Sequence, residues 1–329
     1  MSASTKCAAM VVAFLVCACA YAQKPGAAPS YPVKPIRFIC PYNPGGAGDI
    51  FTRTIARKLA EYLGQSVVVD NRAGANGGIG TALVAKAAPD GYTILMGNSG
   101  PMTVNPNLYR KVPYDPVRDF QPVTQGTVYW YVLVVLTSSE FKTLDDLIAG
   151  LKSKQGALTY GSTGIGGGNH LAGELFNLMT RTKAIHVPYT GSAVALAALL
   201  GGQTSYMFDT VVTAVPHIRA GRLRAFAVTA MKRAPALPDV PTLDQLGLKG
   251  YEITQWQAVV APAGTPPAIV DKLHRAVVRA LASPDVIERI GPPAGNDLVG
   301  NTPEEFAKVI KRDLAKYAKI IKEAGITVQ

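Results

Sequence analysis

Two matching units constrain the fold of this chain more than any other feature. In the first, an apolar strand at Ile36–Cys40 leads into a glycine-rich turn at residues 41–48, and a helix starts at Asp49. In the second, a strand at 158–160 leads into a glycine-rich turn at 161–168 and another helix. Strands that alternate with helices in this way are typical of parallel sheets with helices on both faces.

Because the units lie far apart in the chain, they predict two similar α/β lobes with parallel-rich sheets. Ligands of open parallel sheets bind beyond the carboxyl ends of the strands, where such turns lie. We therefore expect a ligand cleft between the lobes. Residues 31–128 and 253–329 are expected to form the first lobe, and residues 129–252 the second.

The glycine-rich turns favour anion binding. Glycine accepts backbone angles that bring main-chain N–H groups close to a ligand, and the N-terminus of the following helix carries partial positive charge. The dinucleotide pattern fails because Asn169 stands where its last glycine is needed, and no Gly-Lys-Ser/Thr follows either turn. A plain tight turn remains the alternative interpretation for each.

Catalytic and metal-binding patterns are scarce. The four histidines form no metal-ligand pair, so we expect no metal and no cofactor. Residues 97–100 resemble a nucleophile elbow, but Pro101 replaces its closing glycine. A serine hydrolase that uses Ser99 or Ser162 with His170 is the alternative function. Asp209 follows a short apolar strand and is either a cleft residue or an ordinary helix cap.

The net charge of +11, from 33 Lys and Arg against 22 Asp and Glu, leaves anionic partners open. Many of the basic residues alternate with acidic ones on the expected C-terminal helix from Thr302 to about Ala324. That pattern is typical of a solvated helix face, so we expect no nucleic-acid partner.

The N-terminus predicts export. Lys6, an apolar run and Ala20-Tyr21-Ala22 together resemble a cleavable secretory signal at residues 1–22. Residues 23–30 are expected to form a linker. A lipid anchor at Cys19 stays open as an alternative to simple cleavage. Cys40 is then the one cysteine of the mature chain, too few for an internal disulfide.

From about Tyr31 to the C-terminus the chain resembles the Bug family, the periplasmic solute-binding proteins of tripartite tricarboxylate transporters. The resemblance is carried by ordered motifs: Pro44-Gly45-Gly46-x-x-Asp49, Asn71-Arg72-x-Gly74-Ala75, Ala88-Pro89-Asp90-Gly91-Tyr92-Thr93, His170-Leu171-Ala172-Gly173-Glu174, Val187-Pro188-Tyr189-x-Gly191-Ser192-Ala193 and Pro262-Ala263-Gly264-Thr265-Pro266.

The resemblance implies a two-lobed, type II-like periplasmic binding protein that closes on a small carboxylate. It implies a monomer that delivers this ligand to membrane transporter components or to a sensor. The two turns would hold the carboxylate between them. The residues expected at the ligand are Tyr42, Asn43, Gly46, Ala47, Asp49, Ser99, Ser162, Thr163, Gly166, Gly167, Gly168, His170, Thr190 and Asp209.

Three departures from the family pattern bear on the ligand. Family members often have serine where this chain has Gly167 and Gly168, so hydroxyl donors are missing there. Asn43 adds an amide where proline or alanine is frequent, and Gln257 stands where an aromatic or small residue is commoner. Together they predict a pocket that relies on backbone donors, without naming the ligand.

Overall fold

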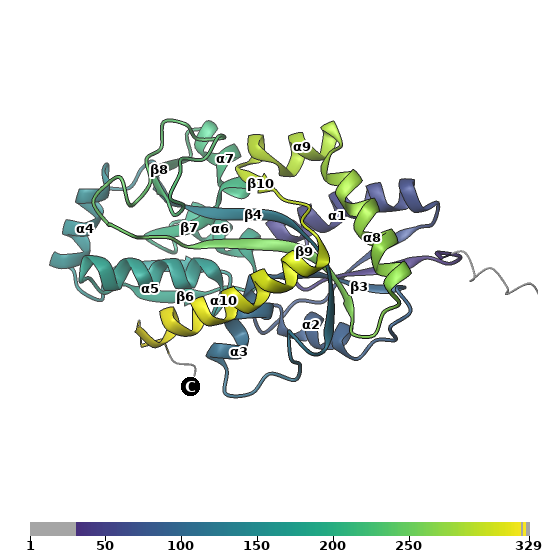
Figure 1. The fold of residues 1–329 in the computed structure, drawn as a ribbon. Helices are drawn as coiled ribbons and strands as arrows, with labels where there is room; N and C mark the ends of the chain where they lie inside the picture. Colours follow the sequence, from purple (N-terminus) through teal and green to yellow (C-terminus); the bar gives the residue numbers. More distant parts are fainter. Residues whose placement is uncertain (1–30, 324, 327–329) are drawn as a thin grey trace, which may run out of the picture.

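The structure is a computed structural model that describes residues 31–323 and 325–326. The expected signal peptide at 1–22, the linker at 23–30 and Cys19 lie outside these residues. The described chain alternates strands and helices along most of its length (Figure 1). No helix in this part of the chain is both long and apolar enough to cross a membrane.

In the described residues, ten strands form one continuous sheet in the order β2-β1-β3-β9-β4-β7-β5-β6, with β8 and β10 also paired to β4. The strands are β1 (Ile36–Cys40), β2 (Val67–Asn71), β3 (Thr93–Asn98), β4 (Phe120–Leu136), β5 (Thr159–Ser162), β6 (Ile185–Pro188), β7 (Tyr206–Thr210), β8 (Leu223–Val228), β9 (Thr254–Pro262) and β10 (Asn296–Leu298). The helices are α1 (Ala47–Leu63), α2 (Gly78–Ala85), α3 (Asn105–Leu108), α4 (Leu144–Ser153), α5 (Gly168–Thr180), α6 (Ser192–Leu200), α7 (Val211–Arg219), α8 (Pro267–Leu281), α9 (Pro284–Ile290) and α10 (Pro303–Glu323).

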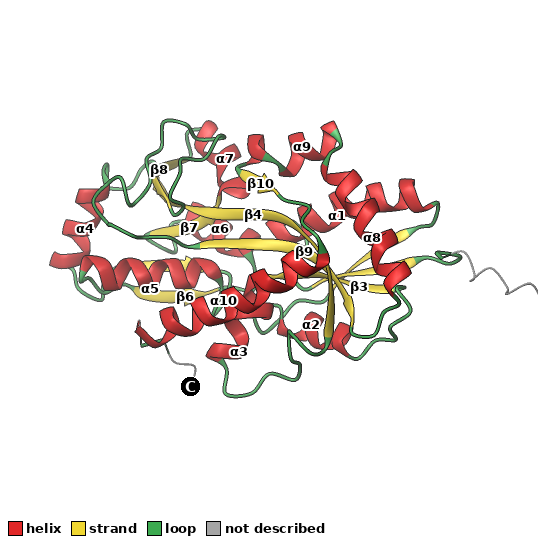
Figure 2. Ribbon diagram, viewed as in Figure 1, coloured by secondary structure: helices red, strands yellow, loops and turns green. Residues whose placement is uncertain are grey.

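The sheet is mixed, with parallel pairing within each half, as expected from the sequence, and antiparallel pairing between the halves. Strand β1 runs parallel to β2 and β3, and β5 runs parallel to β6 and β7. The long strands β4 and β9 run antiparallel to each other and to the strands beside them (Figure 2). These two strands connect the parallel halves, so the antiparallel pairing lies in the middle of the sheet.

Strand β4 passes from one half to the other. Its first part, from Phe120 to Trp130, pairs with β9, and its second part, from Tyr131 to Leu136, pairs with β7 and β8. The chain therefore has the expected two-lobed α/β architecture. The expected lobe boundary at residue 128 falls inside β4 and remains a prediction.

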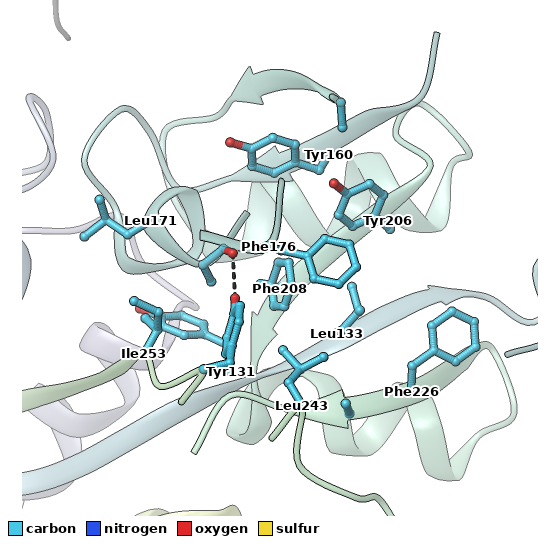
Figure 3. Close-up of a cluster of buried hydrophobic side chains, with 14 of the residues drawn as sticks. Tyr131, Leu133, Tyr160, Leu171, Phe176, Tyr206, Phe208, Phe226, Leu243 and Ile253 are labelled. Carbon is cyan, nitrogen blue, oxygen red and sulfur yellow. Dashed lines mark hydrogen bonds between the residues drawn. The ribbon is translucent and has the colours of Figure 1, made fainter. Parts of the chain in front are cut away.

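Each half has its own apolar core. Phe51, Ile55 and Leu59 lie four residues apart on α1, and all three are buried against the first half of the sheet. In the second half, aromatic rings dominate a buried cluster in which Phe176 packs against Tyr206 and Phe208 (Figure 3). These cores fix the ends of the strands and helices that surround the site.

Candidate functional site

A cavity lies where the two halves of the fold meet. The space between its lining residues, counted together with the open solvent at its mouth, is about 580 Å³. The lining comes from the helix N-termini of both halves and from β3, β4, β7 and β9. It consists of Tyr42, Asn43, Pro44, Gly46, Ala47, Gly48, Asn76, Asn98, Tyr129, Tyr131, Thr163, Gly167, Gly168, Gly191, Ser192, Ala193, Val194, Thr210, Gln255 and Gln257.

Three helices with a glycine N-cap begin at this cavity, and none of them has a side-chain cap. Their N-cap residues are Gly46 for α1, Gly167 for α5 and Gly191 for α6. Elsewhere, α4 starts at a capping box in which Thr143 and Asp146 satisfy the free N–H groups. The first N–H groups of any helix lack partners within the helix. In α5 the His170 N–H donates to Asn169 Oδ1 at 3.1 Å. The other first-turn N–H groups at the cavity have no side-chain cap and can bind a group from outside the helix.

Asp49 holds the first turn in place from outside the cavity. Its carboxylate accepts hydrogen bonds from the Gly45 N–H at 3.0 Å, Arg53 Nε at 2.9 Å and Asn71 Nδ2 at 2.9 Å. Burial by itself raises the pKa of Asp49, but the bonds from Arg53, Gly45 and Asn71 bring the pKa below its ordinary value. Gly45 has a positive φ of 84°, which glycine adopts without strain. Asp49 thus shapes the turn and lies outside the cavity lining.

A pair of stacked histidines holds the second turn. The N–H of Gly166 donates to His170 Nδ1 at 3.1 Å, and Ser162 Oγ bonds to His186 Nε2 at 2.5 Å. The two imidazole rings stack with centroids 4.0 Å apart. Burial, together with the charge of His186, lowers the pKa of His170 to about 3, and burial lowers that of His186 to about 4. Both rings are therefore neutral at neutral pH.

The turn before α1 and the turn before α6 meet across the cavity. Asn43 Nδ2 donates to the carbonyl oxygen of Thr190 at 2.5 Å. A β-carbon at Gly46 would lie 4.0 Å from the backbone nitrogen of Ser192, so the α1 and α6 N-termini are close neighbours. Two helix ends thus present their N–H groups side by side.

Neutral side chains form one wall of the cavity. Tyr42 OH donates to Asn98 Oδ1 at 2.9 Å, and Asn98 Nδ2 donates to Tyr129 OH at 2.9 Å. Tyr129 OH in turn donates to Gln255 Oε1 at 3.4 Å. Among the described lining residues there is no Asp, Glu, Lys, Arg or His. The cavity therefore offers dipoles and hydrogen-bond donors without a formal charge.

The structure explains the glycines at the start of α5. A β-carbon on Gly168 would lie 2.2 Å from Tyr131 OH and 2.5 Å from Gln255 Nε2. A β-carbon on Gly167 would lie 2.5 Å from Thr163 Oγ1. At separations this short a side chain would fit only if the neighbouring residues moved. The donors at these two positions are therefore backbone N–H groups and not serine hydroxyls.

The structure brings half of the expected ligand residues to the cavity. Those in the lining are Tyr42, Asn43, Gly46, Ala47, Thr163, Gly167 and Gly168. Those outside it are Asp49, Ser99, Ser162, Gly166, His170, Thr190 and Asp209. Contact of this second group with a ligand remains a prediction, and several of them have structural partners instead.

Ser99 and Asp209 are both fully buried. Ser99 Oγ accepts the backbone N–H of Trp256 at 2.8 Å, which ties β3 to β9. Asp209 Oδ2 accepts from Thr213 Oγ1 at 2.9 Å, whereas its Oδ1 has no partner among the described residues. Burial raises the pKa of Asp209 to about 7.

The expected site lacked the wall residues Asn98, Tyr129, Tyr131, Gln255 and Gln257. All five lie on strands, and four of them form two pairs spaced two residues apart on β4 and β9. Side chains two apart on a strand share a face. Polar residues at that spacing within apolar strands are the signal that could have found them.

This fold and site define a two-lobed solute-binding protein of the periplasmic type, with an uncharged ligand cavity between the lobes. The chain belongs to the tripartite tricarboxylate transporter family of receptors, the Bug-type proteins, because residues 51–326 match that family's description.

Solved structures agree with this assignment. The periplasmic binding protein BugD is 34% identical, with a TM-score of 0.87 over 91% of this chain and all of its own. An R. palustris protein with adipate is 35% identical, with a TM-score of 0.87 over 90% of this chain and 99% of its own. MatC from Rhodopseudomonas palustris with bound malate is 32% identical, with a TM-score of 0.84 over 88% of this chain and all of its own.

Proposed function

We propose that this receptor captures a small carboxylate between its lobes through uncharged donors and delivers it to a tripartite tricarboxylate-type transporter or to a sensor. One observation carries the proposal: three uncapped helix N-termini begin at a cavity whose described lining contains no charged residue. Each such terminus is equivalent to about half a positive charge. An anion is the ligand that this arrangement favours.

Capture replaces the water molecules around the carboxylate with protein dipoles that are already oriented for it. A carboxylate that leaves water must regain its hydrogen bonds, and N–H donors that point at an ionised acceptor give stronger bonds than neutral pairs. Neutral donors also let the empty cleft open without separating buried ion pairs. The Asn43–Thr190 bond then adds a contact that forms when the lobes close.

The relatives support a carboxylate ligand. Adipate and malate, named with two similar structures, are both dicarboxylates. In this chain the hydroxyl donors that serines often supply are replaced by Gly167 and Gly168. The ligand would therefore depend on backbone N–H groups and on the amides and phenols of the wall.

The proposal includes export and a monomeric state. Residues 1–22 would be removed as a signal peptide, and residues 23–30 would link the mature N-terminus to the fold. Residues 31–128 and 253–329 would move as one lobe and residues 129–252 as the other. The family supports the periplasm as the place of action.

The serine hydrolase alternative is not favoured. Ser162 is fully buried, its hydroxyl bonds to His186 rather than to His170, and it also bonds to Gly164. Neither Ser162 nor Ser99 lines the cavity. A nucleophile must reach the substrate atom that it attacks.

Thermal-shift screening followed by calorimetry tests the proposed function. The panel pairs each carboxylate with its neutral amide, such as adipate with adipamide. We expect at least one carboxylate to bind at micromolar level and its amide to bind about 100-fold more weakly, about 2.7 kcal/mol. Equal binding of acid and amide, or no binding across a broad panel, would contradict the proposal.

A further inference from the structure

A surface groove lies beside the ligand cavity, on a face that both halves of the fold form. It runs between α6 and α7 of the second half and reaches α1 of the first half, and it shares only Ala193 with the cavity. A β-carbon on Gly45 would lie 4.0 Å from Cβ of Ala193, so the two halves touch within the groove. The apolar residues that line this α6–α7 groove include Ile50, Ala193, Leu196, Ala197, Leu200 and Val212.

Helix α6 is apolar along its length, yet one side of it faces solvent. Every residue from Ala193 to Leu200 is alanine, valine or leucine. A helix that is apolar on every face is normally buried on every face. Ala193 and Ala197, which are four residues apart and therefore on the same side of the helix, are exposed in the groove. This side of α6 is therefore suited to contact with a partner.

The exposed charges on α6, on α7 and on the turn that follows α7 are all positive. Between residues 192 and 224 the only acid is Asp209, which is fully buried. At the α7 end of the groove, His217 Nδ1 bonds to the Arg222 guanidinium at 2.5 Å. Burial and the charge of Arg222 lower the pKa of His217, so its ring is neutral near neutral pH. Arg219 is exposed and forms no ion pair with another described residue. The groove therefore combines an apolar lining with a cationic end.

Resting on the proposed function, we propose that the α6–α7 groove is a docking surface for the membrane component of the transporter. The segment that binds there has apolar side chains that fill the groove and acidic side chains that face Arg219 and Arg222. Because Ile50 belongs to one lobe while α6 and α7 belong to the other, the groove is complete only when the lobes close. The transporter therefore docks the loaded, closed receptor in preference to the empty, open one.

Uptake into energised membrane vesicles tests this docking surface. The vesicles come from the bacterium that makes the receptor, and uptake of the labelled carboxylate that binds tightest in the calorimetric panel is measured at increasing concentrations of added receptor. The variants are Ala197→Glu, which places a carboxylate in the groove, and Arg219→Glu, which reverses a charge at its end. The matched controls are Ala315→Glu, at an exposed alanine of α10, and Arg289→Glu, at an exposed arginine in the last turn of α9.

We expect the receptor concentration that gives half-maximal uptake to rise about 10-fold in Ala197→Glu and in Arg219→Glu. Neither residue lines the ligand cavity, so the affinity of each variant for the carboxylate should stay within about twofold of the unmodified receptor. Both controls should match the unmodified receptor, and thermal melts check that every variant folds. Half-maximal uptake at an unchanged receptor concentration in both groove variants would overturn the inference.

Photo-crosslinking identifies what occupies the groove. Ala197→benzoylphenylalanine places a photoreactive side chain there, and the loaded receptor is irradiated with the same vesicles. We expect a crosslink to the transporter's membrane component, identified by mass spectrometry, that is several-fold stronger with the carboxylate than without it. A crosslink to a second copy of the receptor, or equal crosslinks with and without the carboxylate, would contradict the docking surface.

The two proposals fail in different ways. If the unmodified receptor binds a carboxylate and drives its uptake while both groove variants do so equally well, the docking surface is wrong and the proposed function stands. If the unmodified receptor binds a carboxylate but drives no uptake, delivery to a transporter fails and the docking surface fails with it. If it binds no carboxylate at all, the proposed function itself fails.

Discussion

The side chain of Asn43 and the backbone of Thr190 are 147 residues apart in sequence, yet the Asn43 amide donates to the Thr190 carbonyl oxygen at 2.5 Å. The bond joins the turn before α1 to the turn before α6. Because these turns belong to different halves of the fold, it forms only when the halves come together.

Loss of this contact should weaken ligand binding without blocking it. Asn43→Ala removes the amide, and Asn43→Asp keeps its size but replaces the donor with an acceptor that faces a carbonyl. We expect Asn43→Ala to weaken affinity by about 3- to 10-fold, the effect of one hydrogen bond of about 1 kcal/mol, and Asn43→Asp to weaken it more. Calorimetry measures both, and an unchanged affinity in both variants would show that the bond does not contribute to closure.

A side chain at Gly168 should damage the site through Tyr131. In Gly168→Ala the new β-carbon meets Tyr131 OH and Gln255, so we expect a loss of about 1 to 3 kcal/mol in unfolding free energy, together with weaker binding. Removal of the phenol oxygen in Gly168→Ala/Tyr131→Phe should recover part of the stability.

Gly201→Ala is the control for Gly168→Ala. Its β-carbon would meet no atom closer than 3.4 Å, and its φ of −85° suits alanine. Chemical denaturation compares the variants. Equal stability of Gly168→Ala and the unmodified protein would contradict the packing at the start of α5.

The histidine pair predicts a loss of stability in acid. The pKa values of His170 and His186 are lowered from 6.5 to about 3 and about 4. The unfolded chain therefore binds more protons than the folded chain between pH 6.5 and these values, and stability falls as the pH falls through that window. Protonation of His170 Nδ1 also removes the acceptor of the Gly166 N–H.

Thermal unfolding across this pH range tests the histidine prediction. We expect His170→Gln/His186→Gln to be less stable than the unmodified protein near neutral pH but to show a shallower decline in acid. A decline as steep as that of the unmodified protein would assign the acid sensitivity to other groups.

Asp209 predicts the opposite pH dependence. Its folded pKa of about 7 exceeds the ordinary 3.8, so the folded state holds a proton that the unfolded state releases, and stability falls as pH rises through that interval. Asn at this position is neutral at every pH. We expect Asp209→Asn to gain at least about 1 kcal/mol relative to the unmodified protein between pH 5 and pH 8. If the stability difference between Asp209→Asn and the unmodified protein does not change with pH, the pKa of Asp209 is not raised in the folded state.

Local signals in the sequence predicted much of the fold. Strand β1 has the predicted bounds, Thr143 caps α4, and Gly64 ends α1 in a left-handed conformation. The C-terminal helix starts where it was expected, at Thr302, and there Thr302 and Glu305 bond to each other's backbone. Each of these features depends on a few neighbouring residues, which is why a short stretch of sequence contains the information.

The turns of the site were predictable for the same reason, whereas its wall was not. Tyr129 and Gln255 face each other because β4 and β9 pair in one particular register, 126 residues apart. The antiparallel crossing of these strands also made the sheet mixed. Local spacing can indicate which polar residues share one face of β4 or of β9, but the pairing of the two strands depends on the packing of the whole chain.

A structure of the complex with the tightest-binding carboxylate of the panel tests the central claim most directly. The account predicts carboxylate oxygens within about 3.2 Å of backbone nitrogens at the starts of α1, α5 and α6, with no Lys or Arg side chain at the ligand. A carboxylate paired with a basic side chain, or bound outside this cavity, would contradict it.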